Sequence, residues 1–319
     1  MIGSQESVET IYNSMFKPSK QLIMDLCHEA LGPDFFMVRS VSLQATHLVV
    51  YASVRIAHLI REVKSKEVAL GFKGNLGNKG GCSISFFVDK THLCFISCHL
   101  HSGQHVVEQR NQDFKFLTQQ ILQTKQQKSN KVQPAELNAD CVILVGDLNY
   151  RLNGNLQSVL TAIEKNMFED LLFNDQLIFE MKIGKGHGFK EGKILFAPTY
   201  KRKRGSNCEI ATKRNPSWTD RVLYRFNEEN CQLYQKSYDS NNHITLSDHR
   251  PVFSQFLLRY CQAEADESLP QNMNDSGKPQ DIMKNRGLLS TQECQELVLK
   301  NIKENEELGK VKTKPCILF

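Results

Sequence analysis

Apolar residues recur at helical spacing in two long segments of the chain. Residues 20–31 place a stripe of apolar side chains on one helix face and are followed by Gly32, a pattern typical of an amphipathic helix. Residues 108–126 repeat this spacing with Phe114, Leu117, Ile121 and Leu122. Shorter helices are predicted near residues 155–165 and 169–181.

Other apolar runs have the length and the β-branched content of strands. These runs cover residues 47–53, 66–72, 82–88, 92–100 and 141–145. Because strands interleave with helices, the pattern predicts an α/β fold in which helices cover two packed mixed sheets. We expect shorter strands and loops from there to Tyr260.

After residue 260 the chain becomes rich in Asp, Glu, Gln, Asn, Pro and Ser. Such a segment buries too little apolar surface to fold, so residues 261–287 are predicted to be a linker. Ser290 and Glu293 form a capping box before an apolar stripe, which predicts a short helix that docks on the folded domain. The predicted organisation is therefore a domain at 1–260, a linker at 261–287 and a helix with a basic tail at 288–319.

The composition is that of a globular protein, with 40% hydrophobic and 24% charged residues among 319. The net charge of +5 gives only a mild preference for anionic partners. The ten cysteines show no CxxC pair or zinc-like spacing, and Cys94 and Cys98 are expected to be buried as small hydrophobes. Reduced thiols in the cytosol fit this pattern. Without a signal peptide or an apolar run of about 18 residues, we expect neither secretion nor a membrane span.

The strand-like run 141–145 ends in Gly146-Asp147-Leu148-Asn149. Side chains alternate along an extended chain, so Asp147 and Asn149 point to the same side. A carboxylate that accepts a proton and an amide that holds a water form a plausible hydrolytic pair. Taken alone, this segment could equally be a strand end followed by a turn.

Three further segments place acidic or imidazole groups where loops meet strand-like runs. They are Ser97-Cys98-His99-Leu100, Pro216-Ser217-Trp218-Thr219-Asp220-Arg221 and Ser247-Asp248-His249-Arg250-Pro251-Val252. A single histidine at such a place is usually structural, but four clusters of this kind indicate a shared site. For Asp220 a structural pairing with Arg221 is the alternative, and Trp218 is expected to be core packing beneath the site.

These residues resemble the inositol polyphosphate 5-phosphatases, within the magnesium-dependent endonuclease/exonuclease/phosphatase group. The resemblance covers roughly residues 2–260 and also includes GNKGG at 77–81, GDLNYRL at 146–152, PTYK at 198–201 and RNPSWTDRVLY at 214–224. It implies a four-layer αββα sandwich of the DNase I type and magnesium-dependent hydrolysis of a 5-phosphate. GDLN and SDH occur across the wider group, whereas PTYK with the Arg-x-Pro-Ser-Trp-x-Asp-Arg segment is specific to the 5-phosphatases.

The resemblance implies that Glu6 is a ligand of Mg²⁺, a cation that prefers hard oxygen donors. Asp147 is the candidate base, and Asn149 would orient the attacking water or a phosphate oxygen. His249, oriented by Asp220, would donate to a non-bridging phosphate oxygen, and His99 would be a second donor. Asp248 is expected nearer the metal than the substrate.

Substrate contacts are expected from a second set of residues. Lys79 lies among glycines 77, 80 and 81, which either bring backbone amides and an ammonium to a phosphate or only form a hairpin turn. The resemblance assigns the 4-phosphate to Tyr200, Lys201 and Arg214, although Thr212 stands where the family often has a second lysine. The basic run 201–204 could also be a nuclear or nucleic-acid signal, but we expect no nucleic-acid partner.

The last four residues, Cys316-Ile317-Leu318-Phe319, form a prenylation box whose terminal Phe favours geranylgeranyl. Three lysines at positions 310, 312 and 314 supply an electrostatic signal for anionic membranes. We therefore predict a cytoplasmic protein held at cytosolic membrane surfaces through Cys316, where phosphoinositide lipids are its substrates.

The chain departs from the family at its start. Family members carry one more strand before the glutamate segment, ending in a Trp-Asn pair. Without that strand, core surface would stay open and Glu6, close to the amino terminus, would be poorly held, so weak activity is expected. Two rival functions follow: a nuclease on the same fold, and a phosphoinositide-binding module without activity.

Overall fold

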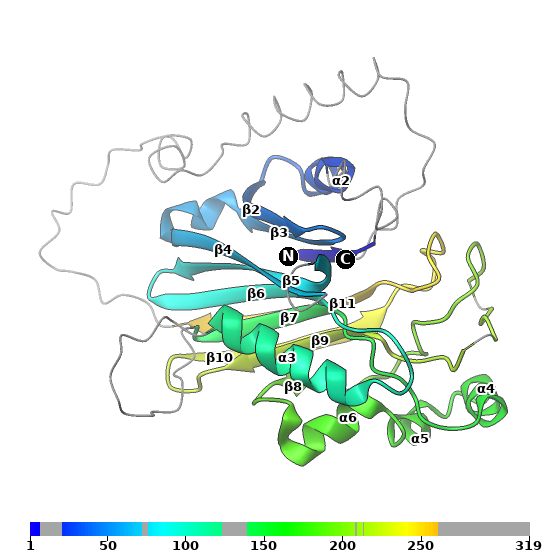
Figure 1. Cartoon of the computed structure of the whole chain (residues 1–319). Coiled ribbons are helices and arrows are strands. Elements are labelled where there is room, and N and C mark those ends of the chain that lie inside the picture. The colour runs from blue at the N-terminus through cyan, green and yellow to red at the C-terminus, as the bar shows by residue number, and fades with distance from the viewer. Residues whose placement is uncertain (7–20, 72–75, 123–138, 208, 213, 261–319) are drawn as a thin grey trace, which may run out of the picture.

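The computed structural model describes residues 1–6, 21–71, 76–122, 139–207, 209–212 and 214–260 (Figure 1). Six strands form a mixed sheet in the order β4-β5-β6-β7-β9-β8. Their bounds are β4 Ile60–Gly71, β5 Leu76–Val88, β6 Thr91–His99, β7 Cys141–Asp147, β8 Lys190–Glu191 and β9 Asp220–Phe226. The β6–β7 pair is parallel and the other pairs are antiparallel.

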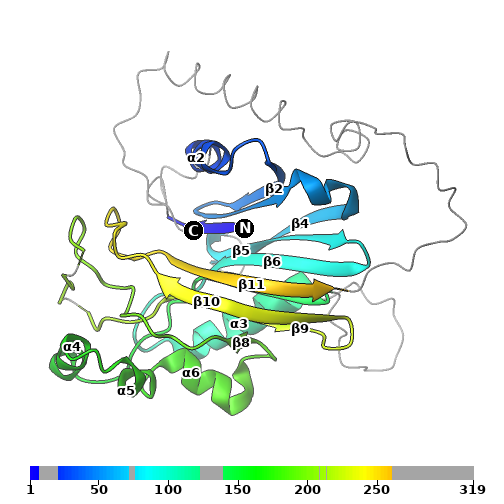
Figure 2. The same ribbon diagram turned by 180° about the vertical axis from the view of Figure 1, so that it is seen from behind.

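Two antiparallel units make the second strand layer. One unit has the strand order β1-β3-β2. The other is the β10–β11 hairpin, which lies against β9 of the six-stranded sheet (Figure 2). The bounds are β1 Ile2–Gln5, β2 Phe35–Leu43, β3 Thr46–Ser53, β10 Cys231–Ser240 and β11 Val252–Tyr260. A 3₁₀ turn, η1 (Val54–Leu59), joins β3 to β4.

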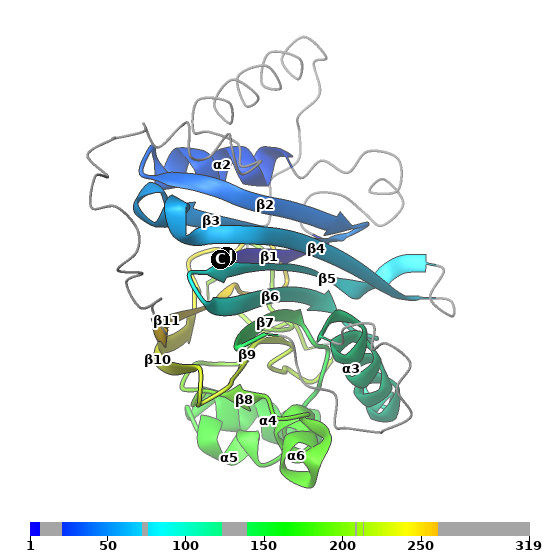
Figure 3. The same cartoon turned by 90° about the vertical axis from the view of Figure 1, so that its left-hand side faces the viewer.

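Helices cover the outer faces of both strand layers (Figure 3). Helix α2 (Gln21–Leu31) packs on β2, and its Met24 carbonyl accepts a hydrogen bond from the Tyr51 hydroxyl of β3, while α3 (Val107–Leu122) packs on the far face of the six-stranded sheet. Further helical elements among the described residues are α4 Leu156–Glu164, α5 Phe168–Leu172, α6 Gln176–Glu180 and the π-helical turn η2 Met181–Lys185. The predicted four-layer αββα architecture is confirmed.

Strand β6 has a continuous apolar run because both of its faces are covered. Leu93 and Phe95 face the core between the strand layers, while Cys94 and Ile96 face the core under α3. A strand covered on both faces needs apolar residues at every position. The predicted burial of Cys94 and Cys98 is confirmed, and burial raises the pKa of the Cys94 thiol to about 12.

Strand pairing brings three of the four chemical segments to one end of the six-stranded sheet, and the fourth, which precedes β11, joins them through the contact of His249 with Asp220. The carboxyl ends of β6 and β7 are in register, with His99 opposite Asp147, and Asp147 is also opposite Asp220 at the start of β9. Gly146 makes the β6–β7 approach possible, because its φ is +149° and an added Cβ would lie 1.9 Å from the Cys98 carbonyl oxygen.

Several sequence expectations need correction. The single helix predicted at 169–181 is two helices, because the Asp175 side chain accepts a hydrogen bond from the Ile178 N–H and begins α6. The glycines at 77, 80 and 81 lie inside β5 and do not form a hairpin turn. Strand β2 was not predicted. The start of the chain is not frayed: β1 pairs with β3, and the Glu6 N–H donates to the Ala45 carbonyl at 2.9 Å.

The polar linker at 261–287, the helix expected at 288–319 and Cys316 lie outside the described residues. In the part of the chain that the structure describes, no helix has the length and apolar character needed to cross a membrane.

Candidate active site

A cleft of about 300 Å³ opens where β6 and β7 end and β9 begins. Nearly all the site residues predicted from the sequence line it: Glu6, Lys79, His99, Asp147, Asn149, Tyr200, Arg214, Asp220, Asp248 and His249. Lys201 is not among the lining residues. Four clusters far apart in sequence therefore form one site in the structure.

An ion pair between His249 and Asp220 forms one wall of the cleft. His249 Nδ1 lies 3.0 Å from Asp220 Oδ2, which also accepts hydrogen bonds from the hydroxyls of Thr199 at 2.7 Å and Thr219 at 3.0 Å. Burial lowers the pKa of His249, but Asp220 more than compensates, and the pKa rises to about 9. His249 is therefore an imidazolium at neutral pH. Of the two partners considered for Asp220, His249 and Arg221, the structure shows the pairing with His249.

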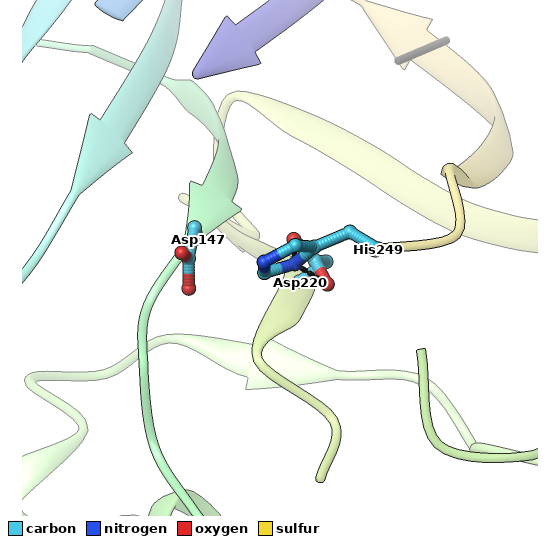
Figure 4. A group of neighbouring side chains, drawn as sticks. All are labelled: Asp147, Asp220 and His249. Atoms are coloured by element: carbon cyan, nitrogen blue, oxygen red, sulfur yellow. Dashed lines mark hydrogen bonds and ion pairs between the residues drawn. The ribbon is translucent and has the colours of Figure 1, made fainter. Parts of the chain in front are cut away.

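Asp147 faces this ion pair from the end of β7 (Figure 4). Asp147 is 7% exposed as a residue, and its Oδ2 lies 3.3 Å from His99 Nε2. Burial raises the pKa of Asp147, but the hydrogen bond and charge of His99, with the charges of His249 and Lys79, hold the pKa below its ordinary value. Asp147 is consequently ionised across the physiological pH range.

His99 is surrounded by three charged side chains. Its Nε2 is close to Lys79 Nζ as well as Asp147, and its Nδ1 is 3.9 Å from Glu6 Oε1. A protonated Lys79 requires His99 Nε2 to accept a hydrogen bond, whereas the Asp147 carboxylate requires the same nitrogen to donate one. The tautomer of His99 therefore decides which of the two hydrogen bonds forms. Burial lowers the pKa of Lys79, partly offset by Asp147 and Glu6.

The Asn149 amide is fixed at both ends. Nδ2 donates to the Leu100 carbonyl at 3.1 Å, and Oδ1 accepts from Arg151 Nη2. The backbone of Asn149 has φ +56°, and its N–H donates to Asp147 Oδ1 at 3.0 Å. Asn149 tolerates this left-handed conformation better than most residues do, and the hydrogen bond ties it to the carboxylate.

The residues expected at the 4-phosphate lie beside His249. Arg214 Nη1 donates to the Tyr200 hydroxyl at 3.2 Å, and the Tyr200 ring lies 4.5 Å from the His249 ring. Lys201 Nζ is 2.9 Å from Asp248 Oδ2. Lys201 therefore faces Asp248, and only Tyr200 and Arg214 of the three reach the cleft.

Two carboxylate environments can be compared as cation sites. Among the described residues, ligand atoms of Asp147, Asp220 and His249 lie within 4.8 Å of one another. A protonated His249 cannot be a ligand, so this trio does not suit a cation as it stands. Glu6 and Asp147 flank His99, whose buried Nδ1 has no hydrogen-bond partner in the described structure. Their oxygens suit Mg²⁺. Asp248 is not in the trio and pairs with Lys201 and Arg204.

Two basic residues of the cleft, Arg151 and Arg204, were not among the site residues predicted from the sequence. Arg151 directly follows Gly146-Asp147-Leu148-Asn149-Tyr150, so its position in the motif was a usable signal. Arg204 was considered only as part of the basic run 201–204. Gln5, Ser102 and Ser247 also line the cleft.

The model of endonuclease/exonuclease/phosphatase family 2 matches residues 1–255. The chain therefore belongs to this family, and its curated relatives within it are inositol 5-phosphatases. Human phosphatidylinositol 4,5-bisphosphate 5-phosphatase A is 34% identical over 82% of this chain and 27% of its own. Mouse type II inositol 1,4,5-trisphosphate 5-phosphatase is 32% identical over 86% of this chain and 28% of its own. The chain thus spans little more than a quarter of the length of these two relatives.

Solved structures agree with the fold. The inositol polyphosphate 5-phosphatase domain of SPsynaptojanin, in complex with inositol (1,4)-bisphosphate and calcium ion, has a TM-score of 0.62 and 26% identity, covering 91% of this chain and 75% of that one. A Cimex nitrophorin ferrous NO complex has a TM-score of 0.60 and 22% identity over 76% and 82% of the two chains. The fold alone therefore does not define a function, and the cleft residues must do so.

Proposed function

We propose that this chain is a magnesium-dependent phosphatase that removes the 5-phosphate of phosphatidylinositol 4,5-bisphosphate or 3,4,5-trisphosphate, and also of soluble inositol polyphosphates. The observation that carries the proposal is that Asp147 faces the His249–Asp220 ion pair across one cleft, with ligand atoms of the three residues within 4.8 Å of one another. A phosphate monoester needs both an acceptor for the proton of water and a donor to its own oxygens.

In this mechanism Asp147 orients the attacking water and accepts its proton as the oxygen–phosphorus bond forms. The Nδ1–H of His249 donates to Asp220, so the Nε2–H can donate a hydrogen bond to a non-bridging oxygen of the phosphate. That contact strengthens as negative charge develops in the transition state. Asn149, held by Leu100 and Arg151, keeps the Asp147 carboxylate in place through its backbone N–H.

Glu6 would hold the magnesium ion, because its carboxylate lines the cleft and offers the hard oxygen donors that Mg²⁺ prefers, and Asp147 lines the same cleft. Two carboxylates would otherwise repel the substrate phosphate. A bound cation would remove that repulsion and would lower the pKa of water, which would complement the weak basicity of Asp147. The calcium ion bound by the SPsynaptojanin domain supports a divalent cation here.

Recognition of a phosphate next to the scissile one rests on Tyr200 and Arg214. Arginine binds phosphate in a bidentate manner, and the Tyr200 hydroxyl fixes the guanidinium. The names of the human and mouse relatives both include a 4-phosphate beside the 5-phosphate, which supports this choice of substrate.

Phosphate release from vesicles containing phosphatidylinositol 4,5-bisphosphate tests the proposal. Turnover should vanish with EDTA and return with Mg²⁺, and D147N should lack it. Binding without release would favour a non-catalytic module. Cleavage of abasic DNA with no release from lipid would favour a nuclease.

We propose further that prenylation of Cys316 holds the enzyme at cytosolic membranes. The Cys-Ile-Leu-Phe sequence and the lysines at 310, 312 and 314 support this attachment, since a single lipid chain needs a second signal for stable binding.

A further inference from the structure

The backbone of Arg151 is clamped from both sides by α6. Its N–H donates to Gln176 Oε1 at 2.9 Å, and its carbonyl accepts from the Gln176 N–H at 3.0 Å. The side chain is buried, with 4% of the residue exposed, although it lines the cleft. Burial of a guanidinium is costly unless its donors are satisfied.

Both hydrogen bonds described for the guanidinium go to Asn149. Nε donates to the Asn149 carbonyl at 3.1 Å, and Nη2 donates to Oδ1 of the same residue. The other end of the Asn149 amide, Nδ2, is bound to the Leu100 carbonyl. A small displacement of Arg151 therefore rotates the amide about this fixed end and changes the orientation of Asn149, whose backbone N–H donates to Asp147.

The flat face of the same guanidinium lies on the Tyr200 ring, with 4.5 Å between Arg151 Cζ and the ring centroid. Such cation–π contacts depend on geometry. Tyr200 in turn accepts from Arg214 and packs against His249. Arg151 is thus the side chain that touches both the Asn149 amide and the Tyr200 ring.

We propose that Arg151 is a positioning residue that couples binding of the neighbouring phosphate at Tyr200 and Arg214 to the orientation of Asn149 and Asp147. The inference rests on the proposed function. When a substrate phosphate engages Tyr200, the ring presses on the guanidinium and fixes Asn149 in its productive orientation. A substrate without that phosphate leaves the ring and the amide less restrained.

The first test compares R151K with R61K on phosphatidylinositol 4,5-bisphosphate and phosphatidylinositol 5-phosphate. Lysine keeps the charge but cannot form two parallel donors or stack as a plane. R151K should lower kcat on the bisphosphate by about 10- to 100-fold, since small misplacements in a site have such effects, with little change in KM. The loss on the monophosphate should be clearly smaller.

R61K is the matched control. Arg61 also lies over an aromatic ring, 5.3 Å from Phe87, but does not line the cleft, and its substitution should change neither substrate. Equal kcat losses for R151K on both substrates would overturn the coupling. A loss confined to KM would also do so, because it would make Arg151 a simple phosphate ligand.

A double-mutant cycle with Y200L isolates the contact itself. If the two residues act as one unit, R151K/Y200L should be no slower on the bisphosphate than Y200L alone. Losses that multiply would show that Arg151 acts independently of Tyr200. Melting temperatures of all variants identify any general loss of structure.

A readout without turnover separates this inference from the proposed function. The ¹⁵N resonance of the Arg151 Nε–H, identified by its absence in R151K, should shift when inositol 1,4-bisphosphate and Ca²⁺ are added to the wild type. Inositol 1-phosphate should leave it unchanged, and so should the bisphosphate in Y200L. A wild type without phosphate release would refute the phosphatase, whereas identical spectral responses to both ligands would refute the coupling.

Discussion

Both oxygens of the Asp220 carboxylate lie within hydrogen-bond reach of one ring nitrogen of His249, at 3.1 Å for Oδ1 and 3.0 Å for Oδ2. This arrangement raises the pKa of His249 to about 9, above its ordinary value of 6.5. A group whose folded pKa is raised contributes stability below its unfolded pKa and loses that contribution as pH rises through the folded value. The contribution of His249 is thus complete below pH 6.5 and lost through pH 9.

The same titration sets the pH dependence of activity. Only the imidazolium donates from Nε2 while Nδ1–H stays on Asp220, so kcat/KM should fall on the alkaline side near pH 9. D220N removes the cause of the raised pKa, and the alkaline limb should move to lower pH. H243Q, at an exposed histidine, is the control and should leave the profile unchanged. A limb that does not move in D220N would show that another group titrates.

Substitution of Asp147 tests the base. D147N keeps the shape of the side chain but cannot accept a proton, and it should reduce kcat by about 10²- to 10⁴-fold. Substrate affinity, measured by equilibrium binding, should change far less, because a base acts on the reacting water. Retention of most turnover would remove Asp147 from the mechanism.

The sequence predicted the site residues better than the contacts between them. Asp147, Asp220 and His249 follow from their motifs, since each motif places its polar residue where a strand begins or ends. The pairing of His249 with Asp220 was expected from the family resemblance. The contact between Arg151 and Tyr200 could not be predicted, because it depends on how two segments about 50 residues apart pack together.

Element boundaries failed where tertiary contacts decide them. The apolar pattern across 169–181 is continuous, but Asp175 ends it because its carboxylate caps α6 and binds Arg221 of β9. Such a break depends on a residue 46 positions away. The predicted helix at 20–31 and the GDLN strand depend on local patterns, and both were recovered.

Arg214 should determine selectivity for the neighbouring phosphate. R214A loses a charge-assisted contact of about 1.5–3 kcal/mol, so kcat/KM should fall on phosphatidylinositol 4,5-bisphosphate and much less on phosphatidylinositol 5-phosphate. R204A is the matched variant, because Arg204 also lines the cleft but pairs with Asp248. Its effect on the ratio of the two substrates should be small. Equal losses in R214A on both substrates would make Arg214 a structural residue.

Membrane attachment is tested by C316S. The variant should move from membranes to the cytosolic fraction and keep its activity on short-chain substrate, because lysines near an anionic surface contribute only about 1 kcal/mol each. Substitution of the lysines at 310, 312 and 314 alone should weaken binding without abolishing it. An unchanged partition of C316S would exclude Cys316 as the anchor.

The ion triad of Arg221 should be a main source of stability beneath the cleft. Arg221 is fully buried and lies 3.0 Å from Asp175 and 2.6 Å from Glu191. Removing one partner of a buried pair leaves an uncompensated charge, which costs about 3–5 kcal/mol. R221A should therefore lower the free energy of unfolding in urea by about that amount. The exposed pair Lys190–Glu228 provides the control, since K190A should cost less than about 1 kcal/mol.

The double variant D175N/R221M tests the cause of this loss. If unpaired charge dominates, removing two of the three charges should destabilise the protein less than R221A does. A double variant less stable than R221A would instead assign the loss to packing around the guanidinium.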